Sequence, residues 1–292
     1  MINYGYEPVM TSRVRRYLIS FANRIGDHPL KYLSSDELDL NNITEITKAN
    51  CRKKLRGDYT STVAEISEIF VSIQGEGPKL GHPSVFIRLS GCNLNCTWCD
   101  TKYASKNPMT MTSKEVVLKA MKLVPSHLWP HYDVVITGGE PMLYPHFIDE
   151  LCKYMGGNRV TIETNGTIPI TILDKDLVDK CIEHIIVSPK LEYIGKVAGY
   201  YDSLKTYSRA SFELPKDVVY FKYVHDGSNI GDIISNISQL VVNDRRVYLM
   251  SMGATRKELL ELDPATITLA KQYNFMWSPR AHVYVYNNKR GK

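Results

Sequence analysis

The chain has 292 residues, of which 43% are hydrophobic and 23% charged, a composition that excludes a disordered or fibrous protein. Its 36 basic and 31 acidic residues leave a net charge of +5, and the basic residues are scattered rather than gathered into the stripe typical of a nucleic-acid-binding surface. No run approaches the roughly 18 apolar residues of a membrane span, and no secretory signal opens the chain, so we expect a cytoplasmic protein without a nucleic-acid or membrane partner.

Residues 1–62 differ from the rest of the chain. This segment is polar and mixed in charge, and it carries no chemical motif. Two short helices are predicted within it, over residues 13–22 and 43–54. We therefore divide the chain into an N-terminal extension of unknown role, residues 1–62, and a larger domain, residues 63–292, that carries every motif described below.

From residue 64 onward, predicted strands and helices alternate along the chain. The strands are short runs of β-branched and other apolar residues, at 64–73, 85–89, 134–137, 160–163, 185–187, 218–224 and 247–250. Capping boxes and helical apolar spacing predict the helices, at 112–124, 147–155, 174–181, from 255 onward, and from Asp263-Pro264 to 273. The last of these begins a new helix because proline favours the first helical turn.

About six strand–helix alternations indicate an α/β protein with a mainly parallel sheet. Curled upon itself, such a sheet gives a partial (β/α)6 TIM-like barrel. Chemistry in barrels of this kind is expected at the carboxyl ends of the strands. The polar motifs of this chain follow those strand ends in the sequence.

Three of the six cysteines lie within one short segment, GCNLNCTWCD. Cys92, Cys96 and Cys99 have the spacing C-x3-C-x2-C, which in a cytosolic chain indicates a metal or redox site rather than a disulfide framework. Three thiolates can hold three irons of a [4Fe–4S] cluster and leave the fourth iron open to another ligand. A structural zinc site is the alternative; it prefers four protein ligands, and His82 is a candidate for the fourth. Other residues are given no site role: Cys51, Cys152, Cys181 and His225.

The cysteine spacing, with Trp98 before the last cysteine, resembles the signature of the radical S-adenosylmethionine (SAM) superfamily. In that superfamily the open iron chelates SAM, and one electron from the reduced cluster cleaves it to a 5′-deoxyadenosyl radical. The resemblance implies a [4Fe–4S] cluster on the three cysteines and SAM as a second cofactor. It also implies that residues 63–292 form a radical SAM catalytic domain with the partial barrel of that type.

Three further segments resemble the SAM-binding loops of that superfamily: GGEP at 138–141, ETNGT at 163–167 and SPK at 188–190. Each alone is typical of a loop, but all three follow predicted strands downstream of the cysteines. Glycine in the first segment permits close approach of the backbone to a ligand. The residues that we expect at SAM, with Trp98 against its adenine, are Gly138, Gly139, Glu140, Glu163, Thr164, Asn165, Ser188 and Lys190.

A longer run, EIFVSIQGEGPKLGHPSVFIRLSGCNLNCTWCDT (68–101), resembles the 7-carboxy-7-deazaguanine synthase family, as do residues 248–259 and 278–292. The resemblance covers residues 64 to 292 and implies a radical ring contraction of 6-carboxy-5,6,7,8-tetrahydropterin with loss of ammonia. This is a lyase step of the deazapurine pathway that leads to queuosine. SAM is regenerated in the family, and Mg²⁺ at the substrate carboxylate assists.

The resemblance also implies a substrate site. Arg88 offers a fixed guanidinium fork for a carboxylate, although a surface salt bridge is its alternative role. The substrate-binding residues that we expect are Gln74, Glu76, Arg88 and His282. Thr101 is expected to give an oxygen to Mg²⁺, a cation that keeps waters or substrate oxygens as its other ligands. Asp100 is expected to orient that shell through hydrogen bonds.

Two partners follow from the same resemblance, a second copy of the chain in a homodimer and a flavodoxin-like reductant. Two other functions stay open from the residues. The first is a radical SAM activase of another protein, because such enzymes share the C-x3-C-x2-C spacing. The second is a zinc- or cluster-bearing nucleic-acid-binding module, which the net charge of +5 and the basic tail prompt.

Overall fold

The computed structural model describes residues 62–155, 159–214, 218–240, 242, 244–287 and 289–291. The helices predicted at 13–22 and 43–54, together with Cys51, lie outside these residues. Among the helices that are described, none is long and apolar enough to cross a membrane.

A single nine-stranded sheet forms the framework of the described domain, in the order β3-β1-β2-β4-β5-β6-β7-β8-β9. The seven strands β2-β4-β5-β6-β7-β8-β9 pair in parallel along this order. Strand β1 pairs antiparallel with both β2 and β3. The strands are β1 Val63–Ile73, β2 Pro83–Leu89, β3 Met109–Thr112, β4 Asp133–Gly138, β5 Val160–Thr164, β6 Ile182–Val187, β7 Val219–His225, β8 Val247–Ser251 and β9 Met276–Trp277.

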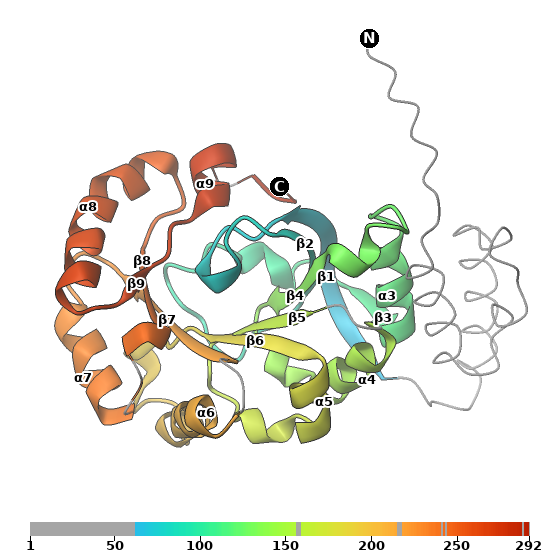
Figure 1. Ribbon diagram of the computed structural model, residues 1–292, viewed down its shortest axis with the longest axis horizontal. Coiled ribbons are helices and arrows are strands. Elements are labelled where there is room, and N and C mark those ends of the chain that lie inside the picture. Colours follow the sequence, from blue (N-terminus) through green and yellow to red (C-terminus); the bar gives the residue numbers. More distant parts are fainter. Residues whose placement is uncertain are drawn as a thin grey trace, which may run out of the picture.

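Helices follow six of the parallel strands: β4, β5, β6, β7 and β8 lead into α4 to α8 in turn, and β2 is followed by the short strand β3 and then α3. The helices are α3 Ser113–Met121, α4 Pro145–Met155, α5 Lys175–Lys180, α6 Tyr200–Glu213, α7 Ile230–Leu240, α8 Arg256–Gln272 and α9 Ala281–Tyr286. The sheet curls, with α3 to α8 along its outer side (Figure 1). This is the predicted α/β fold, a partial (β/α)6 TIM-like barrel.

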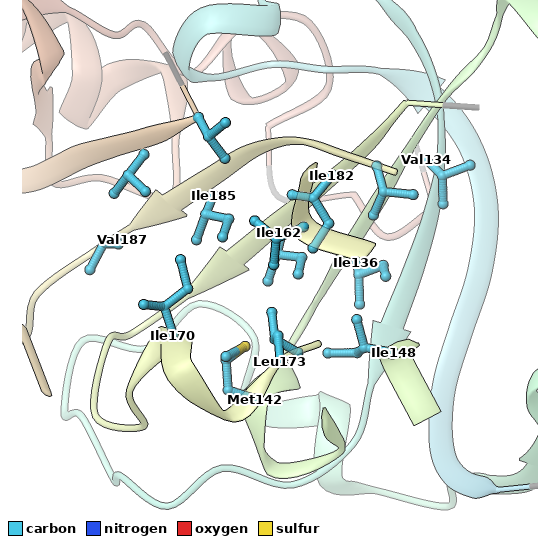
Figure 2. Close-up of a cluster of buried hydrophobic side chains, with 14 of the residues drawn as sticks. Val134, Ile136, Met142, Ile148, Ile162, Ile170, Leu173, Ile182, Ile185 and Val187 are labelled. Carbon is cyan, nitrogen blue, oxygen red and sulfur yellow. The ribbon is translucent and has the colours of Figure 1, made fainter. Parts of the chain in front are cut away.

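The core lies between the sheet and these helices. Buried aliphatic side chains of β4, β5 and β6 face side chains of α4 and of the loops after β4 and β5 (Figure 2). Examples are Ile136, Ile162 and Ile185, each with no exposed surface, against Met142 and Ile148. Burial of one such side chain contributes about 1.5–3 kcal/mol, so the strands form a rigid base for the loops at their carboxyl ends. Cys152 belongs to this core, as its place on an apolar helix face predicts.

Both predicted capping boxes are present. Thr112 and Glu115 cap α3, and Thr255 and Glu258 cap α8. The predicted restart at Asp263-Pro264 is wrong, because α8 runs unbroken through Pro264. Proline in a helix interior costs about 3 kcal/mol, but one face of α8 buries residues on both sides of it. That packing outweighs the local cost.

Candidate functional site

A cavity of about 890 Å³ opens at the carboxyl ends of the parallel strands. The parallel register brings those ends to one edge of the sheet, with Leu89 opposite Gly138 and Thr164 opposite Val187. All but one of the predicted site residues line this cavity: Gln74, Glu76, Arg88, Cys92, Cys96, Trp98, Cys99, Thr101, Gly138, Gly139, Glu163, Thr164, Asn165, Ser188, Lys190 and His282. The fold therefore brings the separate motifs together.

The cysteine loop begins two residues after β2 ends at Leu89. Cys92 is exposed, Cys99 half-buried and Cys96 buried, and none of the three forms a disulfide. Burial raises the pKa of Cys92, and it raises the pKa of Cys96 to about 11. Cys92 and Cys96 are therefore thiols in the metal-free chain, and a metal must displace their protons to bind.

The donor set fits a cluster rather than a single ion. Within the described residues, no three His, Cys, Asp or Glu side chains converge closely enough to hold one metal ion. His82, the candidate fourth zinc ligand, lies just before the amino end of β2 and contacts Asp133 at 3.2 Å from Nδ1 to Oδ2. The cysteines follow the opposite end of that strand, so a zinc site completed by His82 is wrong. A [4Fe–4S] cluster takes each thiolate on a different iron, which suits three cysteines on one cavity wall.

The GGEP turn holds the root of the cysteine loop. The backbone nitrogens of Gly139 and Glu140 donate to the carbonyls of Leu89 and Gly91, at 3.1 and 2.8 Å. A Cβ atom on Gly139 would lie 1.9 Å from the Gly91 carbonyl oxygen. Glycine is required there because two backbone segments touch.

Glu140 is the predicted SAM-binding residue that does not line the cavity. Its carboxylate has no exposed surface and accepts hydrogen bonds from the Met142 nitrogen, the Thr164 hydroxyl and the Asn165 nitrogen, at 2.9, 2.7 and 2.7 Å. Burial raises the pKa of this carboxyl group. Glu140 thus supports the loops from behind the cavity wall, and its contact with SAM stays a prediction.

The ETNGT segment packs against the cysteine loop. The Asn165 amide donates to Asn93 at 3.1 Å, and its nitrogen lies 3.9 Å from the Cys92 sulfur. Asn93 in turn donates to the Thr167 hydroxyl at 2.8 Å. Asparagine side chains therefore connect the loop after β5 to the loop after β2.

Lys190 and Trp98 form another part of the cavity wall. The Lys190 ammonium donates to Ser188 at 2.8 Å and lies 5.2 Å from the centroid of the Trp98 ring. Burial lowers the pKa of Lys190. Trp98 also borders a second cavity of about 450 Å³, which shares Val224 and Met252 with the first.

Gln74 and Glu163, predicted for different ligands, contact each other. The Gln74 amide donates to one Glu163 oxygen at 3.0 Å, and the Thr137 hydroxyl donates to the other, also at 3.0 Å. Gln74 is buried and its carbonyl oxygen accepts from the Glu76 nitrogen at 3.2 Å. The expected substrate residues Gln74 and Glu76 are thus hydrogen-bonded to Glu163, which is expected at SAM.

Glu76 lies among cationic side chains that the sequence did not single out. One carboxylate oxygen pairs with the Lys222 ammonium, and the other is 2.9 Å from Nε of Arg280. Nε2 of His282 lies 3.8 Å from that second oxygen. A lysine inside the otherwise apolar strand VYFKYVH is the signal that could have identified Lys222. Arg280, two residues before His282, carried no comparable signal.

Arg88 is held by the strand beside it. Its Nε lies 2.7 Å from the carboxylate of Glu68, which is its cross-strand neighbour on β1. A guanidinium carries further N–H donors beside Nε, and Arg88 lines the cavity. Arg290 also reaches Glu68, at 3.5 Å, and stacks 4.0 Å from the centroid of the Tyr103 ring.

Thr101 and Asp100 follow the last cysteine on the same wall. The Thr101 hydroxyl lies 3.5 Å from the Cys99 sulfur. The Asp100 carboxylate pairs with Arg280, so its orientation is set by a residue at the far end of the chain. Both side chains offer oxygen atoms at the cavity, and oxygen is the ligand that Mg²⁺ takes.

Comparison with known proteins agrees with this geometry. The radical SAM superfamily matches residues 86–191. The 7-carboxy-7-deazaguanine synthase of Hyperthermus butylicus is 36% identical over 77% of this chain and 94% of its own length. That of Pyrobaculum aerophilum is 34% identical over 78% and 96%. Among solved structures, QueE from Escherichia coli has a similar fold, with a TM-score of 0.53 at 22% identity, over 75% of this chain and 95% of that one.

Proposed function

The chain belongs to the 7-carboxy-7-deazaguanine synthase family of radical SAM enzymes, and we propose that its cavity converts 6-carboxy-5,6,7,8-tetrahydropterin to 7-carboxy-7-deazaguanine. The reaction contracts the pterin ring with loss of ammonia. The observation that carries it is the meeting of the three cysteines with Gln74, Glu76, Arg88 and His282 around one cavity. Identity over most of both chains favours this function over an activase or a nucleic-acid-binding module.

Cys92, Cys96 and Cys99 would hold the [4Fe–4S] cluster. When bound, the cluster supplies an open iron for SAM and the electron that cleaves it. For SAM itself we propose Trp98, which borders both cavities, beside the adenine. Lys190 and the GGEP, ETNGT and SPK segments, which line the first cavity, would surround the rest of the molecule. Glu140 is assigned to the support of those segments through its three hydrogen bonds.

Arg88 binds the substrate carboxylate in this proposal. Glu68 holds its Nε and leaves the other guanidinium nitrogens to form charged hydrogen bonds. Gln74 and Glu76 bind the polar edge of the pterin ring. His282 adjoins Glu76 and is neutral near pH 7, because burial lowers its pKa.

Mg²⁺ is a further part of the proposal. Thr101 would give it one oxygen, and the substrate carboxylate and waters would complete its shell. Asp100 would act beside it through hydrogen bonds, held in orientation by Arg280. Removal of Mg²⁺ with a chelator should therefore lower turnover without loss of the cluster.

We assign the reaction to residues 63–292. A flavodoxin-like reductant, a homodimer and a cytoplasmic location are proposed on the family resemblance. Sedimentation of the reconstituted protein measures its oligomeric state. Reduction of the cluster by a purified flavodoxin, followed by absorbance, tests the donor.

The test of the function is direct. The cluster is reconstituted anaerobically and supplied with SAM, a reductant, Mg²⁺ and 6-carboxytetrahydropterin, and the product is identified by mass spectrometry. We expect 7-carboxy-7-deazaguanine from the wild type and none from Cys96→Ala. A loaded wild-type cluster that cleaves SAM but forms no deazaguanine would overturn the assignment.

A further inference from the structure

Lys222 is a buried cation at the floor of the cavity. It lies in the middle of β7 between Phe221 and Tyr223, whose rings are fully buried in the core. Because side chains alternate across a strand, Lys222 projects from the opposite face, where it lines the cavity with only 6% of its surface exposed. A buried ammonium is costly unless it is paired, and the partner of this one is Glu76.

Arg280 reaches the same carboxylate from the carboxyl-terminal part of the chain. Its Nε lies 2.9 Å from the Glu76 carboxylate, while its two terminal nitrogens bind the Asp100 carboxylate and the Gly253 carbonyl. One guanidinium thus joins the QGEG loop, the loop after the cysteines and the loop after β8. All of these residues line the cavity.

The charges around Glu76 are dominated by these two cations. Burial alone would raise the pKa of Glu76, but Lys222, Arg280 and His282 together hold it far below its usual value. Two other acidic groups interact with these cations, Glu163 with Lys222 and Asp100 with Arg280. Glu76 is therefore a carboxylate across the working pH range.

We propose that Lys222 and Arg280 are positioning residues that fix Glu76 as an acceptor for N–H groups of the substrate ring. This inference rests on the proposed function. An ionised carboxylate accepts at about four lone pairs and cannot donate. The two cations occupy one position on each oxygen, so each oxygen keeps room for one further donor.

Two adjacent N–H donors, as in the N3–H and 2-amino groups of a pterin, match that arrangement. A ring with a 2-oxo group in place of the 2-amino group presents a carbonyl there instead. A fixed carboxylate repels that carbonyl, so the site excludes 2-oxo analogues. Lys222 and Arg280 thereby act on which ring is accepted, not on the chemistry at the cluster.

The test uses the holoenzyme and compares Lys222→Gln with Lys222→Arg. The first removes the charge, and the second keeps it. Arg280→Gln and Arg280→Lys form a second pair. Lys257→Gln is the matched control, because Lys257 lies exposed on α8 and its ion pair with Glu261 is long, at 3.9 Å. Cluster absorbance and circular dichroism confirm that each variant is folded and loaded.

The measured quantity is the ratio of variant to wild-type KM for carboxytetrahydropterin, from pH 6 to pH 8.5. Without Lys222, burial is opposed by less positive charge, so the pKa of Glu76 rises and the group protonates as pH falls. We expect the ratio for Lys222→Gln to reach roughly tenfold to hundredfold at pH 6, the worth of a charged hydrogen bond, and to shrink toward pH 8.5. Lys222→Arg and Lys257→Gln should give ratios near one at every pH.

A second measurement tests which substrate ring the site accepts. In calorimetric titrations the wild type should bind the 2-amino substrate and reject its 2-oxo analogue. Lys222→Gln should show a smaller difference in affinity between the two compounds. A ratio for Lys222→Gln that does not vary with pH would overturn the role of Lys222, as would an equal effect of Lys222→Arg. Should Lys222→Gln fail to fold, the same test is applied to Arg280→Gln, whose KM relative to the wild type is then measured from pH 6 to pH 8.5. Failure of the proposed function is distinct, because the wild type itself would then form no product.

Discussion

The Glu140 carboxylate accepts a 2.7 Å hydrogen bond from the backbone nitrogen of Asn165. This contact joins the turn after β4 to the loop after β5, and a second bond from the Thr164 hydroxyl strengthens it. The turn after β4 also holds the cysteine loop, because Gly139 packs directly against the backbone of Gly91. One buried side chain thus sets the relative positions of three loops around the cavity.

Glu140→Gln should destabilise the fold and weaken SAM binding. The amide places an N–H₂ group against a backbone N–H donor, and the loss of a buried acceptor costs about 1–3 kcal/mol. Urea unfolding and calorimetric titration of SAM measure the two effects. Glu213→Gln, on the exposed end of α6, should change neither. A Glu140→Gln enzyme with wild-type stability would contradict the supporting role.

Gly139→Ala should prevent normal loading of the cluster. The added Cβ would lie 1.9 Å from the Gly91 carbonyl oxygen, so the root of the cysteine loop must move, at a cost of about 1–3 kcal/mol or more. Iron and sulfide content per chain measures the loading. Gly231→Ala is the matched control, because its Cβ meets open space on α7 and alanine favours a helix by about 1 kcal/mol. Full iron content in Gly139→Ala would show that the loop tolerates the shift.

Arg88→Lys should raise the KM for carboxytetrahydropterin while the cluster and SAM cleavage stay intact. Lysine keeps the charge but loses the planar fork that binds a carboxylate with two parallel bonds. Loss of one charged hydrogen bond corresponds to roughly a tenfold to hundredfold increase in KM. Steady-state kinetics measures this, with Arg209→Lys on the exposed side of α6 as the control. An unchanged KM would remove Arg88 from the carboxylate site.

Lys79→Met should reduce stability without any effect on KM. Lys79 is buried near the amino ends of β4 and β6, at 2.8 Å from Glu183 and 3.4 Å from Asp133. Removal of one partner from a buried ion pair costs about 3 kcal/mol. Urea denaturation at pH 7 measures the loss, and a change in KM instead would place Lys79 at the reaction.

The same ion pair predicts how stability depends on pH. Burial would raise the pKa of Glu183, but its hydrogen bond and charge interaction with Lys79 lower it overall. A carboxyl group with a lowered folded-state pKa stabilises the fold above its unfolded value of about 4.3 and loses that contribution as pH falls through the folded value. The wild type should therefore lose more stability than Lys79→Met between pH 6 and pH 3. Equal losses in parallel denaturation curves would contradict this.

The cysteine loop and the GGEP, ETNGT and SPK segments were predictable from the sequence, because each combines its polar or metal-binding residues with a short loop directly after a strand. Cysteine spacing and polar segments after apolar strands need no knowledge of distant contacts. The helices α6 and α7 were both missed, but only α6 has a physical reason, because serines make up half of its buried face. Helix α7 buries Ile233, Ile237 and Leu240 at helical spacing, an apolar pattern that does predict a helix. Ser203, Ser208 and Ser211 are buried in α6, and Asn236 of α7 accepts a hydrogen bond from the buried Tyr223.

Lys222 and Arg280 were missed for another reason. Their roles depend on pairing with Glu76, 146 and 204 residues away in the sequence. Neither residue type nor spacing indicates such a partner. The supporting hydrogen bonds of Glu140 were not predicted for the same reason, since its partners Thr164 and Asn165 come from another strand end.

The triple contact of Arg280 has a consequence for the order in which the site is built during synthesis. A ribosome delivers the cysteines and the GGEP, ETNGT and SPK segments in the first two thirds of the chain. Arg280 and His282 emerge only in its last fifteen residues. The cysteine loop and its supporting turns are thus synthesised before Arg280 and His282, and the contacts that complete the surroundings of Glu76 form only after these two residues have been added.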